Sequence, residues 1–332
     1  MKIAIYGTGS WGTAMAVQLA SKHASISMYA RNEAFAEELS ESRINKKYLP
    51  NVVLPNHLFI SHDMNAVFYG ADMIILAAPS HGIADAAKQL LPFLQEETIV
   101  VLTAKGLEQG TGRRLSESVS DIVGHITQNI CVLSGPNHAE EVGIGQPSAT
   151  VIAGMNAAAV EKVQEAYMLP TFRAYRNEDM IGVEYAGALK NIIALCTGII
   201  TGLGYGDNTK AALITRGLAE IKRFGVHFGA KPDTFMGLAG MGDLIATCMS
   251  PHSRNRTAGI ALSQGKTIEE IQKGTNMVIE GVRATDIVYH IAKEKNIPMP
   301  ITEKLFEVLY CGNTPQQAVN ELMERKKQVE TR

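Results

Sequence analysis

A single lysine stands in a long apolar stretch of the sequence. Lys190 lies within residues 182–201, and the residues three and four positions away are only alanine, glycine and isoleucine. On a helix, none of these neighbours could pair with its charge. The side chain either snorkels to water along its aliphatic stem, or it is buried, which disfavours the ammonium ion and makes a lysine usable as a general acid or base. The second interpretation predicts a proton transfer at this residue.

Two arginines, a hydroxyl group and an amide are gathered in the run SRNR at residues 253–256, just before a helical stretch at 257–263. Arginine side chains and the free N–H groups of a helix start bind anions, and phosphate suits both. The alternative is a solvated basic turn. Shortly before this run, Asp243 follows three glycines in GLAGMGDL at 237–244, where backbone and ligand could approach closely. Asp243 could also cap a helix, and the two roles are compatible.

The glycine spacing at the start of the chain predicts a dinucleotide site. Gly7, Gly9 and Gly12 (GTGSWG) follow a short apolar strand at 2–6 and precede a helix at 13–22. Gly7 permits the tight turn, Gly9 lets a pyrophosphate approach the backbone, and Gly12 allows the helix to pack closely on the strand. The N–H groups at the helix start then face the anion. A glycine-rich turn without a ligand is the alternative.

The end of the second predicted strand, residues 25–30, bears on the choice of cofactor. An Asp or Glu usually holds the ribose 2′-hydroxyl of NAD at this place. This chain has Ala30, Arg31 and Asn32 instead, and its first acid is Glu33. An arginine in place of a carboxylate suits a 2′-phosphate, so we expect NADP, with NAD as the second choice. A solvated surface arginine is the alternative.

Alternating strands and helices predict an α/β fold. The later apolar strands are expected at 71–78, 98–103, 130–133, 149–153 and 172–175. This order is typical of a Rossmann-type, doubly wound parallel sheet, in which ligands bind beyond the carboxyl ends of the strands. Lys105 and Gly135 come soon after two of these strands and should face the cofactor. For Lys105, a solvated loop lysine is the alternative.

The character of the sequence changes after Asn177. Helical runs and turns alternate from residue 180 onwards, without a convincing strand. Because the chain is also too long for one ordinary core, we predict two domains. These are a dinucleotide-binding Rossmann domain at residues 1–178 and an all-α substrate and catalytic domain at residues 179–332. Residues 45–55, with two prolines, are expected to form an irregular excursion.

Composition argues against several classes of partner. The chain has 332 residues, of which 46% are hydrophobic and 19% charged, and a formal net charge of −2. These values describe a soluble globular protein and give no support for nucleic-acid or membrane-surface binding. The longest apolar run, 192–200, falls short of the roughly 20 residues that span a bilayer. Scattered cysteines suit a reducing cytoplasm, no signal peptide is expected, and His57 and His62 lack a third metal ligand nearby.

Six short motifs follow one another along nearly the whole chain. They are GTGSWG at 7–12, AKG at 104–106, SGP at 134–136, GALKN at 187–191, GLAGMGDL at 237–244 and SRNR at 253–256. This set resembles the soluble, bacterial NAD(P)-dependent glycerol-3-phosphate dehydrogenases. The resemblance implies reversible hydride transfer between NAD(P)H and C2 of dihydroxyacetone phosphate, which gives sn-glycerol 3-phosphate for phospholipid synthesis. It also implies a cytoplasmic homodimer without membrane insertion.

The same resemblance assigns roles to individual residues. Lys190 would contact the substrate and act as the catalytic acid/base. The other substrate contacts would be Lys105, Gly135, Asn137, Asp243, Ser253, Arg254 and Asn255. Besides the three glycines, the cofactor contacts would be Ser10, Trp11, Arg31, Lys105, Ala139, Arg254, Val278 and Glu280. Position 137 departs from the family, whose members more often carry a small hydroxyl residue there.

Two other functions remain open. A β-hydroxyacid or 6-phosphogluconate-type dehydrogenase would also use a lysine on a helix, but usually with an asparagine one turn away, whereas Lys190 and Asn191 are adjacent. A non-catalytic, NADP-binding redox sensor would leave Lys190, Asp243 and the run at 253–256 without a function.

Overall fold

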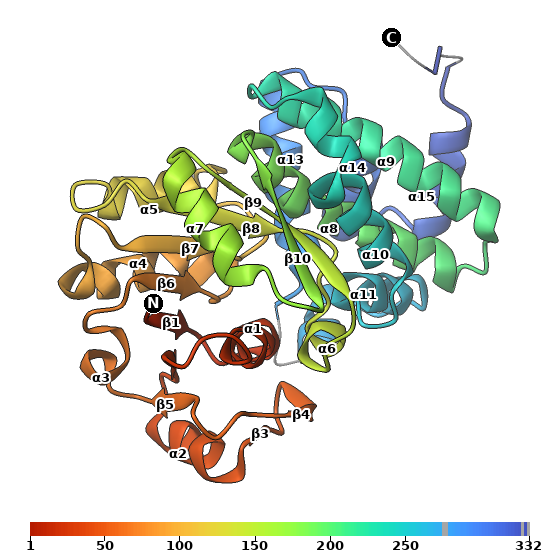
Figure 1. The fold of residues 1–332 in the computed structure, drawn as a ribbon. Coiled ribbons are helices and arrows are strands. Elements are labelled where there is room, and N and C mark those ends of the chain that lie inside the picture. Colours follow the sequence, from red (N-terminus) through yellow and green to blue (C-terminus); the bar gives the residue numbers. More distant parts are fainter. Residues whose placement is uncertain (274–277, 327–328, 331–332) are drawn as a thin grey trace. The chain divides into compact units, whose positions relative to one another are not determined.

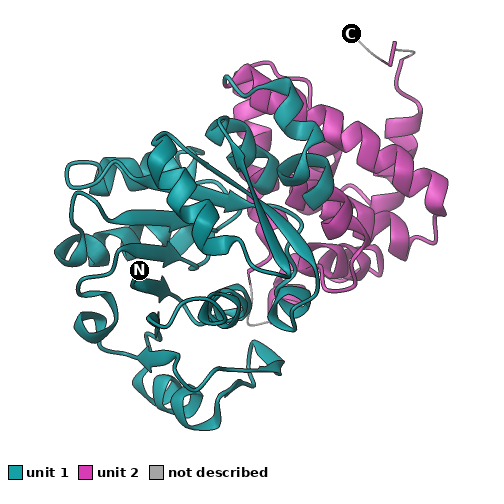
Figure 2. Ribbon diagram, in the orientation of Figure 1, with its two compact units in different colours: residues 1–187, 229–243 teal, residues 188–228, 244–332 magenta. Residues whose placement is uncertain are grey.

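The structure is a computed structural model, and it describes residues 1–273, 278–326 and 329–330. The chain divides into two compact units, which Figure 2 distinguishes by colour. Unit 1 comprises residues 1–187 and 229–243, and unit 2 comprises residues 188–228 and 244–332. The predicted domain boundary after residue 178 stands just before helix α8 (Met180–Gly202), whereas the chain first passes from unit 1 to unit 2 within this helix. The boundary itself stays a prediction.

Unit 1 is built on an eight-stranded sheet. Its strands are β1 (Ile3–Tyr6), β2 (Ile26–Tyr29), β5 (Phe59–Ser61), β6 (Met73–Leu76), β7 (Ile99–Leu102), β8 (Ile130–Ser134), β9 (Ser148–Gly154) and β10 (Phe172–Asn177). They lie in the order β10-β9-β8-β7-β6-β1-β2-β5, with β1 paired in parallel to both β2 and β6. Strand order therefore reverses at β1, as in a doubly wound sheet. The predicted Rossmann-type α/β class is confirmed.

One edge of this sheet corrects the prediction of parallel strands throughout. β9 runs antiparallel to β8, and β10 pairs in parallel with β9. The helix between β8 and β9 is α6 (Ala139–Gly143), which has five residues. Such a helix rises about 7.5 Å, less than the roughly 16 Å length of a five-residue strand. Because α6 is too short to return the chain along the sheet, the next strand runs in the opposite direction.

Alternate residues of β1 serve the two faces of the sheet. Ile3 and Ile5 lie in one buried cluster with residues of α1 and α7, while Ala4 and Tyr6 lie in another with residues of α4 and α5. This period of two is expected of a strand that is covered on both sides, and Figure 1 shows helices on both faces. The helices of unit 1 besides α6 are α1 (Ser10–Ala20), α2 (Glu33–Ser42), α3 (Met64–Phe68), α4 (Ile83–Leu90), α5 (Leu115–Val123) and α7 (Ala157–Tyr167).

The expectation of an irregular excursion at residues 45–55 was wrong. The segment contains most of an antiparallel pair, β3 (Ile44–Asn45) and β4 (Leu49–Val53). Leu49 and Val52 are buried, and a Cβ built on Gly143 of α6 would lie within 3.0 Å of both side chains. A two-stranded ribbon has only edge strands, which tolerate proline. The apolar residues of the segment therefore fix its structure despite the prolines.

In the residues of unit 2 that the structure describes, all regular secondary structure is helical, and turns connect the helices. Two glycines bring α8 and α11 into backbone contact: a Cβ on Gly198 would lie 2.0 Å from the carbonyl oxygen of Arg256, and one on Gly259 would lie 2.1 Å from that of Leu195. This approach fixes the start of α11 relative to the middle of α8. Besides α8, the helices that lie in unit 2 or extend into it are α9 (Asp207–His227), α10 (Asp243–Met249), α11 (Arg254–Ser263), α12 (Ile268–Lys273), α13 (Glu280–Glu294), α14 (Pro300–Tyr310) and α15 (Pro315–Met323).

Helix α8 also corrects the argument from apolar runs. It has 23 residues and is long and apolar enough to cross a bilayer by length and composition. In the structure, 94% of an apolar 18-residue stretch of this helix is buried inside the protein. A buried core helix passes the same test of length, so burial rather than length identifies the place of α8.

Candidate active site

The glycine turn of unit 1 has the geometry that a dinucleotide needs. Gly7 has a φ of +116°, and a Cβ there would lie 2.9 Å from the carbonyl oxygen of Ala77. A Cβ on Gly12 would lie 2.2 Å from the carbonyl oxygen of Gly7, so α1 packs directly on the turn. A Cβ on Gly9, the N-cap residue of α1, would meet nothing within 4 Å. The turn thus leaves open space at the start of α1, and the residues present fit a bound pyrophosphate.

A buried asparagine from β3 supports this turn. Asn45 has no exposed surface. Its Nδ2 donates to the carbonyl oxygen of Thr8 at 2.9 Å and to Oγ1 of Thr13 at 2.8 Å. Its Oδ1 accepts the N–H of Tyr48 at 3.1 Å. Asn45 could not be predicted from the sequence, because its contact with Thr8 joins positions 37 residues apart. The only local signal is a polar residue beside a short apolar strand.

The carboxyl ends of the strands carry most of the remaining predicted cofactor residues of unit 1. Arg31 is exposed just after β2, and the next residue, Asn32, caps α2 by accepting the N–H of Phe35 at 2.8 Å. Ser10 opens α1, the partly buried Trp11 packs against the core, and Ala139 opens α6. Glu33, the first acid after β2, contacts His62, whose Nε2 lies 3.3 Å from its Oε1.

Three of the predicted substrate residues meet within unit 1. Nζ of Lys105 donates to the carbonyl oxygen of Gly135 at 2.8 Å and to Oδ2 of Asp243 at 2.7 Å. The side chain of Asp243 is 2% exposed and that of Lys105 is 22% exposed. A charge-assisted hydrogen bond of this kind holds both side chains in one geometry. The alternative of a solvated loop lysine is therefore wrong for Lys105.

Asn137 lies beside this group, and one of its polar side-chain atoms has no hydrogen-bond partner. Its Nδ2 donates to the carbonyl oxygens of Pro136 at 3.0 Å and Ala149 at 2.8 Å. Its Oδ1 is buried and accepts no hydrogen bond, and the buried hydroxyl of Ser134 also has no partner. A buried polar atom without a partner costs free energy unless a water or a ligand satisfies it. Both oxygens therefore leave hydrogen-bonding capacity unused within the described residues.

Lys190 of unit 2 is buried and held by a hydroxyl group. Its residue surface is 6% exposed, and its Nζ donates to Oγ1 of Thr247 at 2.6 Å. The snorkelling interpretation is therefore wrong. Thr247 was missed from the sequence, although it stands one helical turn after Asp243 on α10, where i and i+4 side chains share a face. That spacing is the signal that could have found it.

The predicted phosphate residues lie at the start of α11 in unit 2. Ser253 is the N-cap residue, and its hydroxyl accepts the N–H of Arg256 at 3.3 Å. Nη1 of Arg254 donates to the carbonyl oxygen of Val278 at 3.3 Å, which links α11 to the segment before α13. Glu280, the other predicted cofactor residue of this segment, is the first residue of α13.

Asn255 forms the centre of a second link within unit 2. Its Nδ2 donates to Oδ1 of Asn191 at 2.9 Å, and its Oδ1 accepts the N–H of Gly281 at 2.8 Å. The start of α11 is thereby tied both to α8, next to Lys190, and to the start of α13. Asn191 is a further residue whose role the sequence did not reveal.

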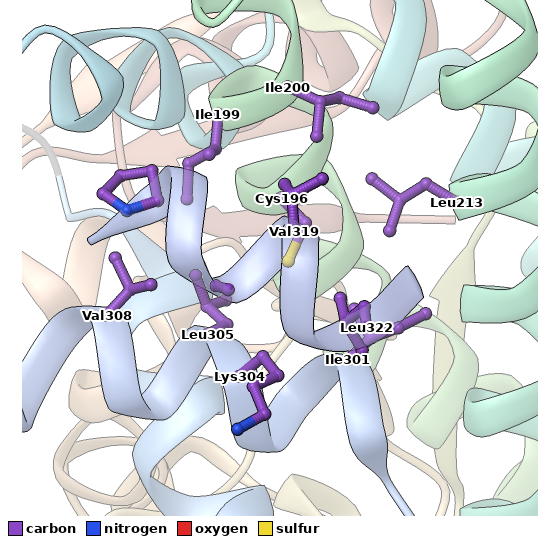
Figure 3. Close-up of a pocket in the computed structure, with 12 residues that line it drawn as sticks. Cys196, Ile199, Ile200, Leu213, Ile301, Lys304, Leu305, Val308, Val319 and Leu322 are labelled. Carbon is purple, nitrogen blue, oxygen red and sulfur yellow. The ribbon is translucent and has the colours of Figure 1, made fainter. Parts of the chain in front are cut away.

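An apolar cavity in unit 2 is separate from all of these residues. It has a volume of about 40 Å³ and is enclosed by side chains of α8, α9, α14 and α15, as Figure 3 shows. Lys304 lines it but lies 2.7 and 2.6 Å from carboxylate oxygens of Glu307 and Glu321. Cys196 also lines it, and burial raises the pKa of its thiol. The cavity offers no reactive group. In the described part of the chain, no cluster of His, Cys, Asp or Glu could hold a metal ion.

These features together define a class of protein. A glycine turn on a doubly wound sheet, with a helical unit that carries a buried lysine, is the arrangement of a nicotinamide-dependent oxidoreductase. Residues 2–160 match the family model for the N-terminus of NAD-dependent glycerol-3-phosphate dehydrogenase, and residues 179–320 match the model for its C-terminus. The chain belongs to this family, and the alternatives left open by the sequence are not favoured.

Individual relatives agree over nearly the whole chain. It is 49% identical over 329 residues to glycerol-3-phosphate dehydrogenase [NAD(P)+] of Desulfitobacterium hafniense, which covers 99% of this chain and 93% of the relative. It is 50% identical over 323 residues to the enzyme of the same name from Moorella thermoacetica, covering 97% and 96%. The crystal structure of glycerol-3-phosphate dehydrogenase from Coxiella burnetii superposes with a TM-score of 0.92 at 39% identity, covering 98% and 99%.

Proposed function

We propose that this protein is an NAD(P)-dependent glycerol-3-phosphate dehydrogenase, which interconverts dihydroxyacetone phosphate and sn-glycerol 3-phosphate. Membership of the family over both halves of the chain supports the reaction class. The glycine turn, whose geometry fits a dinucleotide, supports the use of a nicotinamide cofactor. When bound, the nicotinamide supplies the hydride for C2 of the ketone or accepts it in the reverse direction.

The observation that carries this proposal is the buried Lys190 with its Nζ held by Thr247. A carbonyl oxygen that becomes an alcohol needs a proton. The Lys190 ammonium would donate that proton to the oxygen on C2 during reduction, and the neutral amine would remove it during oxidation. Thr247 accepts a hydrogen bond from the lysine and so orients it without competing for the transferred proton.

The start of α11 is proposed to hold the phosphate of the substrate. Ser253, Arg254 and Asn255 occupy the N-cap and the first two positions of this helix, where free N–H groups and the helix dipole favour an anion. Arg254 would add charge-assisted hydrogen bonds. Because a cofactor phosphate has the same chemistry, Arg254 is also proposed as a cofactor contact, together with Val278 and Glu280.

The group around Lys105 is proposed to orient the rest of the substrate. Asp243, which is buried and paired with Lys105, would accept hydrogen bonds from substrate hydroxyls. Gly135 and Asn137 lie beside this pair and are proposed as further substrate contacts. Asn137 stands where a small hydroxyl residue is more usual.

Cofactor choice and cellular setting complete the proposal. Arg31 after β2 favours the 2′-phosphate of NADP, with NAD as the weaker cofactor. In unit 1, the glycine turn, Ser10, Trp11, Lys105 and Ala139 would form the remaining contacts. We further propose a cytoplasmic homodimer without membrane insertion, whose product serves phospholipid synthesis.

A turnover assay tests the function. Oxidation of NADPH and NADH is followed by absorbance with dihydroxyacetone phosphate, unphosphorylated dihydroxyacetone and a 2-keto acid as substrates. We expect turnover with the phosphorylated ketone, a large loss without the phosphate, and none with the keto acid. Equal turnover of the two ketones, or preference for the keto acid, would contradict the proposal.

A further inference from the structure

One histidine that the proposed chemistry does not use lies at the cofactor edge of the sheet. β5 pairs in parallel with β2, with Ser61 opposite Tyr29, and the N–H of Ala30 donates to the carbonyl oxygen of Ser61 at 3.0 Å. The carboxyl ends of parallel strands meet at the same edge of a sheet. His62 therefore follows β5 where Arg31 follows β2.

This edge also carries the first acid after β2. Glu33 is the first residue of α2, and Nε2 of His62 lies 3.3 Å from its Oε1. The side chain of His62 is 45% exposed and that of Glu33 is 66% exposed. Asp63, the residue after His62, caps α3 by accepting the N–H of Asn65 at 2.8 Å. A contact this exposed contributes little to stability. Its effect would lie in where it holds the Glu33 carboxylate, two residues along the chain from Arg31.

We propose that His62 determines cofactor specificity by holding the Glu33 carboxylate away from Arg31 and from the adenosine ribose. Without His62, the Glu33 carboxylate would be free to pair with Arg31. It would also accept a hydrogen bond from the 2′-hydroxyl of NAD and repel the 2′-phosphate of NADP. Engaged by His62, the same carboxylate leaves Arg31 for the phosphate. The inference extends the proposed function, on which it rests only for the statement that NAD(P) binds at this edge.

Calorimetric titrations with NADP⁺ and NAD⁺ test the proposal without any turnover. The measured quantity is the ratio of Kd for NAD⁺ to Kd for NADP⁺. His62→Ala removes the contact with Glu33 at a half-exposed position, so folding should be retained, and the ratio should fall three- to tenfold. His290→Ala is the matched control, because Nδ1 of His290 lies 3.3 Å from Oδ1 of Asp286 in a similarly exposed pair on α13. This control should leave the ratio unchanged.

A double-mutant cycle shows whether the histidine acts through Glu33. In the Glu33→Gln background, His62→Ala should have no further effect on the ratio. An unchanged ratio in His62→Ala, an equal effect in His290→Ala, or a full effect that persists without Glu33 would overturn the proposal. Turnover of dihydroxyacetone phosphate is measured separately. If turnover is absent but the Kd ratio shifts, the proposed function alone is refuted. If turnover is normal but the Kd ratio does not shift, the role of His62 alone is refuted.

Discussion

The glycine turn of unit 1 and the Lys190 region of unit 2 are encoded in different ways. The turn is local, because three glycines within GTGSWG are enough to set its shape, with a strand before and a helix after them. Lys190 depends on Thr247, which is 57 positions away, and its neighbour Asn191 reaches Asn255 across 64 positions. Backbone shape can therefore be read from a motif, whereas the environment of a buried side chain requires the fold.

This contrast has one exception, which is instructive. The glycine turn has a locally determined shape, but a distant residue supports it: Asn45 of β3 donates to the turn carbonyl of Thr8 and to Oγ1 of Thr13 in α1. A side chain without exposed surface that satisfies a turn carbonyl contributes rigidity where a ligand is to bind. The two regions thus share a principle: a short motif presents the functional group, and distant polar side chains fix it.

The largest effect among the variants that separate the two regions is expected for Gly9→Val. Because a Cβ at this position meets nothing within 4 Å, the chain should fold, with about 1 kcal/mol lost at the cap of α1. The new side chain would occupy the space of the pyrophosphate and displace its charge-assisted hydrogen bonds. Kd for NADPH, measured by calorimetry, should rise about 100- to 1,000-fold. Unchanged affinity would place the cofactor elsewhere.

A smaller effect is expected at the start of α11. Arg254→Ala should lower kcat/KM for dihydroxyacetone phosphate by about ten- to a hundredfold, the worth of a charge-assisted hydrogen bond or two. Arg254→Lys keeps the charge but not the planar fork and should recover only part of the loss. The unphosphorylated ketone is the control. An equal penalty on both ketones would assign Arg254 to the cofactor alone.

Asn45→Ala should produce a still smaller change, confined to the cofactor. Loss of the hydrogen bonds to the turn carbonyl of Thr8 and to Thr13 of α1 should weaken NADPH binding about tenfold, while kcat at saturating cofactor stays within about twofold. Asn156→Ala removes the cap of α7, where Oδ1 accepts the N–H of Ala158 at 3.0 Å, and is the matched control for lost stability in unit 1. A tenfold loss of affinity in both variants would show that Asn45 acts through general stability.

Glu220 provides the smallest expected effect on activity and a defined effect of pH. Its carboxylate caps α14 by accepting the N–H groups of Ile301 at 2.7 Å and Thr302 at 3.3 Å. Burial raises its pKa to about 7 from the ordinary 4.5. The folded protein therefore holds this proton more tightly than the unfolded chain, and stability falls as pH rises from about 4.5 through 7, by up to about 3 kcal/mol.

Glu220→Gln should remove that dependence. Denaturant unfolding should give similar stabilities for variant and wild type near pH 5, and a more stable variant near pH 8. Turnover should stay within about twofold, because this buried acid of unit 2 has no proposed part in the chemistry. A larger loss of turnover would contradict the proposal that Lys190, and not Glu220, takes part in the reaction.

Sequence patterns predicted the parts of the molecule that local rules govern. Apolar strands separated by helices indicated the sheet, and the change after Asn177 indicated the helical second half. They failed at β9, whose direction depends on the short α6, and at β3 and β4, where buried Leu49 and Val52 prevail over two prolines. In the candidate site, the apolar neighbours of Lys190 indicated that it could be buried. Asn45 and Asn191 were missed because only tertiary contacts give them a role, and Thr247 was missed although its spacing from Asp243 is visible in the sequence.

The central claim is that the turn of unit 1 binds the cofactor and Lys190 of unit 2 transfers the proton. A single-turnover measurement on Lys190→Ala tests it most directly, with enzyme preloaded with NADPH and mixed with dihydroxyacetone phosphate. Lys210→Ala, which removes a lysine paired with Asp207 at 3.1 Å on α9, is the control. The account predicts a rate constant lower by about two to four orders of magnitude in Lys190→Ala alone, with Kd for NADPH within about twofold of wild type. A rate constant within tenfold of wild type, or a matching loss of NADPH affinity, would contradict it.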